Sequence, residues 1–258
     1  MEKVISTQLM EYLENNNLLN ESKYAYRNNS STEQAPVNVT EQIYKSIDKG
    51  KISLLVLDLS KAFDSVNHEL LLNKLVQLNI DSTWFASYLH DMTHSVKIDK
   101  IMSEANSNLY GVPHLSILGP ILFNIFINDI TKINSLPEIT TSTTIYADDV
   151  QLLFSGTPYN LEQLKIYAET SRKRMKEWYN ENGLKMNLNK TRCILFATPN
   201  FNKRTETFQI TIDDTVMHTE DKVKNLGVIF DSCLSFEHHI KSLCFRLNGT
   251  LSYLNRVN

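Results

Sequence analysis

A run of apolar residues from Ile52 to Leu57, ending at Asp58, sets the architecture of this chain. A half-exposed strand would alternate apolar and polar residues, so a run that is apolar at almost every position favours a central strand covered on both faces. The run therefore predicts a layered fold with this strand in its core. It also places a carboxylate where the strand leaves that core.

Two more carboxylates lie in the apolar stretch TTIYADDVQLLF, residues 143–154. This stretch predicts two short strands joined at Ala147, Asp148 and Asp149, since Asp is common in tight turns between apolar runs. Adjacent carboxylates repel each other, so we expect a cation beside them. Antiparallel pairing would bring Asp58 to the same place, and such a cluster can hold two divalent cations for phosphoryl transfer. Taken alone, a pair of adjacent Asp residues is more often a surface turn.

Helical periodicity predicts most of the other elements. The expected helices cover residues 2–15, a segment from about 32 to near 50, and residues 67–78, 120–133 and 160–182. Residues 17–32 read as a polar connection. We expect Ser31 or Thr32 to cap the second helix and Pro36 to disturb its middle.

The helix over residues 160–182 has the clearest pattern. Its apolar stripe includes Leu164 and Trp178 and should face the core, and Gly183 supplies the stop. The basic residues are expected to cover its solvated faces. They are Arg172, Lys173, Arg174 and Lys176.

Composition excludes several classes of protein. The chain has 258 residues, of which 42% are apolar and 21% charged. These values fit a folded chain of one large domain or two smaller ones, and they exclude a disordered or fibrous protein. Three cysteines without a C-x-x-C pair argue against a disulfide framework and a cysteine-built zinc site. We expect neither a signal peptide nor a membrane span, because no apolar run approaches roughly 18 residues.

The net charge of −3 conceals an asymmetry between the two parts of the chain. Residues 1–155 hold 11 Lys and Arg against 18 Asp and Glu, a net charge of −7, and the remainder holds 15 against 11, a net charge of +4. A nucleic-acid-binding protein usually presents a basic face. The bulk charge therefore weakly opposes that function, although a local basic stripe matters more than the sum.

Five strings in a fixed order strengthen the case for phosphoryl transfer. They are LVLDLSKAFDSVNHELLLNKL at 55–75, GVPHLSILGPILFNIFINDI at 111–130, YADDVQLLF at 146–154, NGLKMNLNKT at 182–191 and NLGVIFD at 225–231. Together they resemble the reverse transcriptases of non-LTR retrotransposons of the jockey-like or LINE-like kind. The resemblance covers essentially the whole chain.

This resemblance implies an α+β fold, namely a right-hand polymerase palm with partial fingers and a truncated thumb. Its domains would be partial fingers at 1–51, a palm at 52–232 with part of the fingers within 67–110, and the start of the thumb at 233–258. Asp58, Asp148 and Asp149 would be the catalytic, metal-binding carboxylates, with help from the backbone oxygen of Leu59. The implied cofactor is a pair of Mg²⁺ ions, with Mn²⁺ as an alternative.

The same resemblance implies the substrates and the residues that contact them. An RNA template, a DNA primer and deoxynucleoside triphosphates would be bound. Phe63 corresponds to the aromatic residue under the sugar, Arg27 to a fingers arginine suited to phosphate, and Lys190 to a palm lysine near the triphosphate. Leu115 stands where the family has a glycine beside the nascent base pair. From sequence alone, Phe63 also fits an ordinary core residue, and Arg27 and Lys190 also fit solvated surface positions.

The chain departs from the family pattern at several positions. The family string GVPQGS is here GVPHLS, with His114 and Leu115. Met92 and His94 stand where Arg and Gln are usual, and KYAYR replaces a segment that usually begins with Gln before Arg27.

Three functions therefore remain open. The first is an RNA-directed DNA polymerase of a non-LTR retrotransposon, acting inside the cell, in the nucleus or cytoplasm. The second is a catalytically dead remnant or adopted palm that binds nucleic acid or protein, and the third, less favoured, is a maturase or RNA replicase of the same fold.

Overall fold

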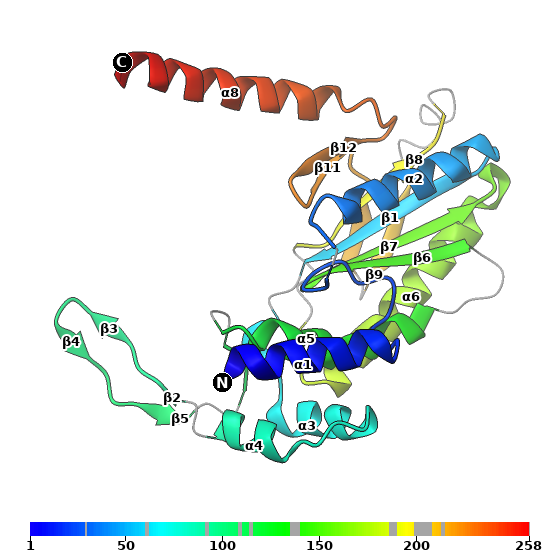
Figure 1. The fold of residues 1–258 in the computed structure, drawn as a ribbon. Helices are drawn as coiled ribbons and strands as arrows, with labels where there is room; N and C mark the ends of the chain where they lie inside the picture. The colour runs from blue at the N-terminus through cyan, green and yellow to red at the C-terminus, as the bar shows by residue number, and fades with distance from the viewer. Residues whose placement is uncertain are drawn as a thin grey trace.

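A four-stranded antiparallel sheet forms the centre of the molecule (Figure 1). The computed structural model describes residues 1–28, 30–59, 62–90, 93–107, 110–113, 116–134, 140–185, 190–198, 208–212 and 215–257. The sheet has the strand order β6-β7-β1-β8. Its strands are β1 (Ile52–Leu59), β6 (Thr140–Tyr146), β7 (Asp149–Gly156) and β8 (Arg192–Phe196). The apolar run is thus a central strand, as predicted.

Both faces of β1 are buried, which explains its apolar sequence. Leu54 and Val56 belong to one core, and Leu55 and Leu57 belong to a second core on the opposite face, as the alternation of side chains along a strand requires. The helices that contribute to the first core are α1 (Glu2–Asn15), α3 (His68–Gln77), α4 (Thr83–His90), α5 (Gly119–Phe126) and α6 (Leu161–Glu181). The second core lies between the sheet, α2 (Gln34–Asp48) and the hairpin of β11 (Lys222–Asn225) and β12 (Val228–Asp231).

The remaining elements lie at the periphery. A ribbon of β2 (Thr93–His94), β3 (Lys97–Ile98), β4 (Ile101–Met102) and β5 (Asn106–Ser107) projects from the body, and β9 (Gln209–Ile212) pairs with β10 (Thr215–His218). The described residues also form the 3-10 helices η1 (Phe63–Ser65), η2 (Asn128–Asn134) and η3 (Pro158–Asn160). The last helix, α8 (Glu237–Val257), extends away from the sheet (Figure 1).

Two of the predicted helices differ in detail. The N-cap of α2 is Glu33, so the prediction of a cap at Ser31 or Thr32 is wrong. Pro36 lies in the first turn, where a missing N–H leaves no intrahelical bond unmade, and it therefore does not disturb the middle of the helix. The helix predicted over 120–133 ends at Phe126, and η2 follows where the Asn128 side chain donates to the carbonyl of Leu18 at 2.6 Å.

The prediction that Arg172 is solvated is wrong. Its side chain is 0% exposed, and its Nη2 donates to Thr191 Oγ1 at 3.1 Å. Thr191 immediately precedes β8, so the guanidinium joins α6 to that edge of the sheet. The predicted apolar stripe of α6 is confirmed, because Leu164 and Trp178 are buried in the first core. Lys173 and Arg174 are exposed as predicted, whereas Lys176 is partly buried.

The predicted α+β class is confirmed by this arrangement of helices around an antiparallel sheet. No helix within the described ranges is long and apolar enough to cross a membrane.

Candidate active site

The register of the sheet brings the predicted catalytic positions to one end of β1 and β7. Leu59 is the pairing partner of Asp149, and Asp58 is the partner of Val150. Directly paired residues of antiparallel strands have Cα atoms about 4.5 to 5.5 Å apart. The side chains of Asp58 and Leu59 lie outside the described part of the structure, so it is their backbone positions that meet the Asp148–Asp149 turn.

A two-residue turn presents Asp148 at this end. Tyr146 pairs with Asp149, so Ala147 and Asp148 form the turn of the β6-β7 hairpin. Ala147 has a φ of 53°, a left-handed conformation that costs a non-glycine residue roughly 1 to 2 kcal/mol. Such strain is typical of functional sites, where the surrounding structure holds it in place. Asp148 and Asp149 are both partly buried.

Tyr26 lies near the carboxylates, and sequence reasoning did not select it as a site residue. Burial raises the pKa of Tyr26, and the charges of Tyr146 and Asp148 raise it further. The Tyr26 ring is 6.1 Å from the ring of Phe63 in an edge-to-face arrangement. Tyr26 is the residue just before Arg27 in KYAYR, so its proximity to Asp148 is set by tertiary contacts and has no local pattern that predicts it.

Phe63 is held in a fixed orientation between aromatic neighbours. It is buried, and it stacks on Phe123 of α5 with ring centroids 4.0 Å apart and an interplanar angle of 17°. Backbone hydrogen bonds from Val112 N to Phe63 O, at 3.0 Å, and from Gly111 N to Val66 O, at 2.7 Å, attach the GVP loop to η1. The next residues of that loop, His114 and Leu115, lie outside the described residues.

Gly119 fixes the far end of the same loop. A Cβ at this position would lie 2.2 Å from the carbonyl oxygen of Pro113, so a larger residue cannot fit without a backbone shift. The Ser116 hydroxyl donates to that carbonyl at 2.9 Å and accepts from Gly119 N at 2.8 Å. The loop therefore packs tightly against the start of α5.

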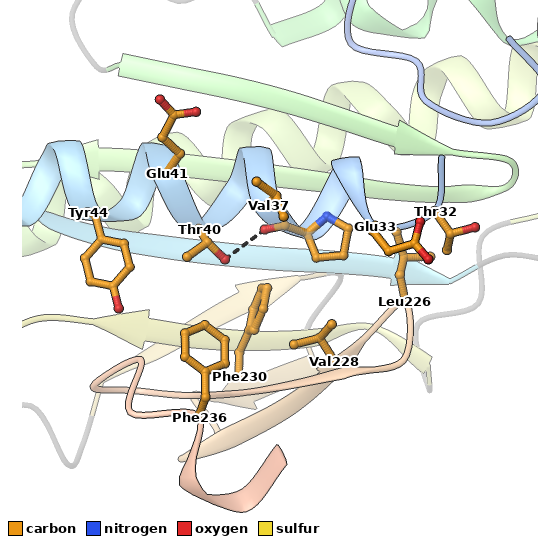
Figure 2. A pocket seen from close by; sticks show the side chains of 11 residues that line it. Thr32, Glu33, Val37, Thr40, Glu41, Tyr44, Leu226, Val228, Phe230 and Phe236 are labelled. Atoms are coloured by element: carbon orange, nitrogen blue, oxygen red, sulfur yellow. Dashed lines mark hydrogen bonds between the residues drawn. The ribbon is translucent and has the colours of Figure 1, made fainter. Parts of the chain in front are cut away.

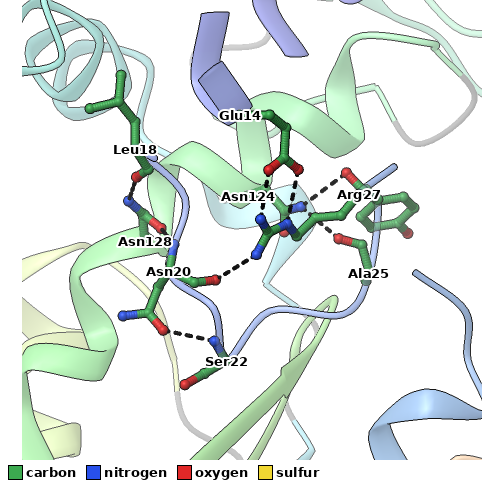
Figure 3. A network of polar contacts seen from close by, with 9 residues as sticks. Glu14, Leu18, Asn20, Ser22, Ala25, Arg27, Asn124 and Asn128 are labelled. Atoms are coloured by element: carbon green, nitrogen blue, oxygen red, sulfur yellow. Dashed lines mark hydrogen bonds and ion pairs between the residues drawn. The ribbon is translucent and has the colours of Figure 1, made fainter. Parts of the chain in front are cut away.

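Arg27 is engaged in a polar network between α1 and α5 (Figure 3). Its Nε and Nη2 donate to the two carboxylate oxygens of Glu14 at 3.0 and 2.6 Å, and its Nη1 donates to Asn20 O at 3.1 Å. The hydrogen bond to Glu14 raises the pKa of Arg27. Asn124 Nδ2 donates to Ala25 O at 2.7 Å. This network fixes the segment that carries Tyr26, and Asn124 is a positioning residue that sequence reasoning missed.

Two lysines lie at different depths around the site. Lys190 is partly buried and precedes β8, whose Arg192 pairs with Leu57, so it lies at the same end of the sheet as Asp58. Lys23 is 1% exposed, and its Nζ donates to the carbonyl of Asn124. Burial lowers the pKa of Lys23 well below its usual value, and the opposing attraction of Asp129 does not restore it.

The carboxylate set suits a hard divalent cation. Asp58, Asp148 and Asp149 supply only oxygen atoms, the ligands that Mg²⁺ and Mn²⁺ prefer. Among the described side chains, which do not include that of Asp58, no group of three His, Cys, Asp or Glu residues is placed to hold a metal. The three-carboxylate site thus depends on Asp58.

An apolar groove lies on the face of α2 that is turned toward the β11-β12 hairpin (Figure 2). It has a volume of about 500 Å³ and runs between α2 and the β11-β12 hairpin, with Phe230 and Phe236 on one side and Val37 on the other. The hydroxyls of Thr32 and Tyr146 are 2.7 Å apart and join the segment before α2 to the end of β6.

The sequence of the chain matches one family model over residues 1–230, the reverse transcriptase (RNA-dependent DNA polymerase). The chain belongs to this family. Related proteins support a jockey-like reverse transcriptase domain. The probable RNA-directed DNA polymerase from transposon BS of Drosophila melanogaster is 28% identical over 269 residues, which cover 98% of this chain and 28% of the relative. The RNA-directed DNA polymerase from mobile element jockey of Drosophila funebris is 28% identical over 206 residues, which cover 77% of this chain and 22% of the relative.

The fold of this reverse transcriptase domain also resembles solved polymerases. Apo telomerase from Candida tropicalis, truncated from its C-terminal domain, superposes with a TM-score of 0.57 at 14% identity, covering 92% of this chain and 44% of that one. The match confirms a right-hand palm-like fold. The domain spans less than a third of the length of the curated relatives named above.

Proposed function

We propose that this domain is an RNA-directed DNA polymerase that adds deoxynucleotides to the 3'-hydroxyl of a primer inside the cell. The observation that carries the proposal is the sheet register, in which Asp58 and Asp149 occupy adjoining pairs of β1 and β7 beside the Asp148 turn. In a reverse transcriptase domain this arrangement supports phosphoryl transfer at that end of the sheet.

The residues have distinct proposed roles. Asp58 and Asp148 would hold the metal ions, with Asp149 and the carbonyl of Leu59 in support. Mg²⁺ is the proposed metal and Mn²⁺ the alternative, because carboxylates, water and substrate phosphates complete its octahedral coordination. When bound, such ions neutralise charge on the triphosphate and on the attacking oxygen.

Phe63 and Tyr26 supply the aromatic surface next to the carboxylates. We propose that Phe63 lies under the sugar of the incoming nucleotide and disfavours a 2'-hydroxyl, since its stacking on Phe123 holds the ring rigid. Lys190 would contact the triphosphate from the same end of the sheet. Arg27 remains a proposed phosphate ligand, and its two hydrogen bonds to Glu14 support an additional role in orienting Tyr26.

Metal binding is tested by thermal unfolding with and without Mg²⁺ or Mn²⁺. Ligands that bind only the folded state raise the melting temperature, so the ions should stabilise the native chain more than Asp148→Asn. Asp99→Asn is the matched control, because Asp99 is exposed on the peripheral ribbon. Equal shifts in all three chains would show that the cluster holds no metal.

Activity is tested by primer extension on an RNA template with deoxynucleoside triphosphates. We expect incorporation by the native chain to disappear in Asp148→Asn and to persist in Asp99→Asn. The alternative function is a nucleic-acid-binding remnant, which the replacement of the family glycine by Leu115 favours. Binding of a primed RNA template without extension, in the presence of either metal, would support that alternative and contradict the polymerase proposal.

A further inference from the structure

Residues 232–236 connect β12 to α8, and together with Asp231, the last residue of β12, they form what we call the joint. α8 packs against β12 and then continues away from the sheet (Figure 1), and several of its large apolar side chains are exposed, among them Ile240, Leu247 and Leu251. The direction of α8 is therefore set largely at its first turn. Contacts that hold the joint rigid therefore also fix the direction of α8.

Asp231 is the centre of the hydrogen bonds in this joint. Its Oδ1 accepts from Cys233 N at 3.2 Å and from Ser235 N at 2.9 Å. Its Oδ2 accepts from the Ser235 hydroxyl at 3.0 Å and from Phe236 N at 2.8 Å. Both carboxylate oxygens are thus used, and they accept from the backbone N–H groups of residues 233, 235 and 236.

The backbone of the joint adopts a conformation that needs this support. Leu234 and Phe236 have φ values of 53° and 56°, in the left-handed region that side-chain-bearing residues rarely adopt. Two such residues within three positions persist only where the surroundings hold them. Asp231 supplies that restraint through the backbone N–H groups on either side of Leu234.

Side-chain contacts link the joint to the palm. Leu234 is buried in the second core, and the ring of Phe236 meets that of Phe230 edge-on with centroids 6.0 Å apart. His239, in the first turn of α8, accepts a hydrogen bond from Ile229 N at 3.4 Å. These contacts give α8 one preferred direction once the joint has its native backbone.

We propose that Asp231 is a positioning residue that fixes the direction in which α8 leaves the palm. Because α8 falls in the predicted start of the thumb, a fixed direction keeps that segment beside the primer path, and this consequence rests on the proposed polymerase function. The hydrogen bonds of the Asp231 carboxylate run to residues 233, 235 and 236 of the joint. Loss of this carboxylate should therefore affect how long the primer is held more than the chemical step.

The direction of α8 is measured by spin-label distances in the full chain without substrate. Cys244 is an exposed label site on α8, and Lys173→Cys adds a second exposed site on α6. Cys233→Ser removes the other exposed thiol but keeps the backbone N–H of residue 233. Cys193 is buried, and burial raises the pKa of its thiol to about 12, so Cys193 should not be labelled.

We expect one narrow distance distribution for the native joint, a broad one for Asp231→Ala and an intermediate one for Asp231→Asn, which keeps one acceptor oxygen. Asp221→Ala is the control, because it removes the same charge from an exposed position nearby. A distribution for Asp231→Ala as narrow as that of the control would overturn the proposal. If Asp231→Ala fails to fold, the widths of the distance distributions of Asp231→Asn and Ser235→Ala are compared with that of the control instead.

Primer extension with a trap for released chains supplies the functional measurement. Asp231→Ala should lower the number of nucleotides added per binding event by at least about threefold and leave the rate of the first addition within about twofold. Equal losses in both quantities would contradict a positioning role. Absence of extension by the native chain would refute the polymerase proposal, whereas the spin-label distances would still decide the role of Asp231.

Discussion

Replacing Gly111 with alanine should destabilise the fold more than the same change at Gly227. Both glycines have a φ of 88°, so the backbone penalty for a side chain is matched. Their surroundings differ. A Cβ at Gly111 would lie 3.1 to 3.2 Å from the Cα, carbonyl carbon and carbonyl oxygen of Asp64, whereas nothing lies within 4 Å of a Cβ at Gly227.

The expected magnitudes follow from this contrast. A left-handed φ costs an L residue roughly 1 to 2 kcal/mol, of which the lower entropy of the unfolded chain offsets about 0.4 to 1 kcal/mol. Gly227→Ala should therefore cost about 0 to 1.6 kcal/mol. At Gly111 the clash is with backbone that hydrogen bonds to Phe63 and Val66 hold in place, so overpacking adds about 1 to 3 kcal/mol and the total is about 1 to 4.6 kcal/mol.

Urea unfolding followed by circular dichroism measures the two losses. The slope of free energy against urea should be unchanged, so that the midpoint reports stability alone. Because Gly111 lies against η1, its alanine variant should also displace Phe63 and slow the first nucleotide addition, whereas Gly227→Ala should not. Equal losses of stability at the two glycines would refute the argument that close packing against Asp64 requires glycine at position 111.

Three further outcomes are expected. Lys23→Gln should stabilise the fold. Because the pKa of Lys23 is lowered in the folded state, the unfolded chain binds more protons than the folded chain at pH values between that pKa and 10.5. The free energy of unfolding of the native protein therefore rises with pH in this range. The stability gained by Lys23→Gln, measured by urea unfolding, should shrink over the same range. Lys74→Met should cost about 1 to 3 kcal/mol in the same assay, because it leaves the carbonyl of Phe126 without the Nζ donor at 2.6 Å, whereas the exposed Lys45→Met should cost little. Leu115→Gly should raise nucleotide incorporation if the leucine fills space for the nascent base pair, and no increase would contradict that view.

The sequence by itself determined the central sheet and the position of the carboxylates along it. The apolar run of β1 predicts burial on both faces of the strand. The apolar segments on either side of Ala147 and Asp148 predict a hairpin. The apolar stripe of α6 is likewise predicted by the local sequence pattern. In each case the signal is the spacing of neighbouring residues along the chain.

Only the tertiary structure decided which charged and aromatic residues meet. Arg172 looks like a solvated helix residue and is buried, because the start of β8 covers it with Thr191. Lys23 lies in a segment that reads as a polar loop, yet its side chain is enclosed beside α5. Tyr26 lies close enough to Asp148 for the charge of that residue to raise its pKa, although more than a hundred residues separate the two in the sequence. Local periodicity describes one element at a time, whereas these environments arise from the packing of elements that are distant in sequence.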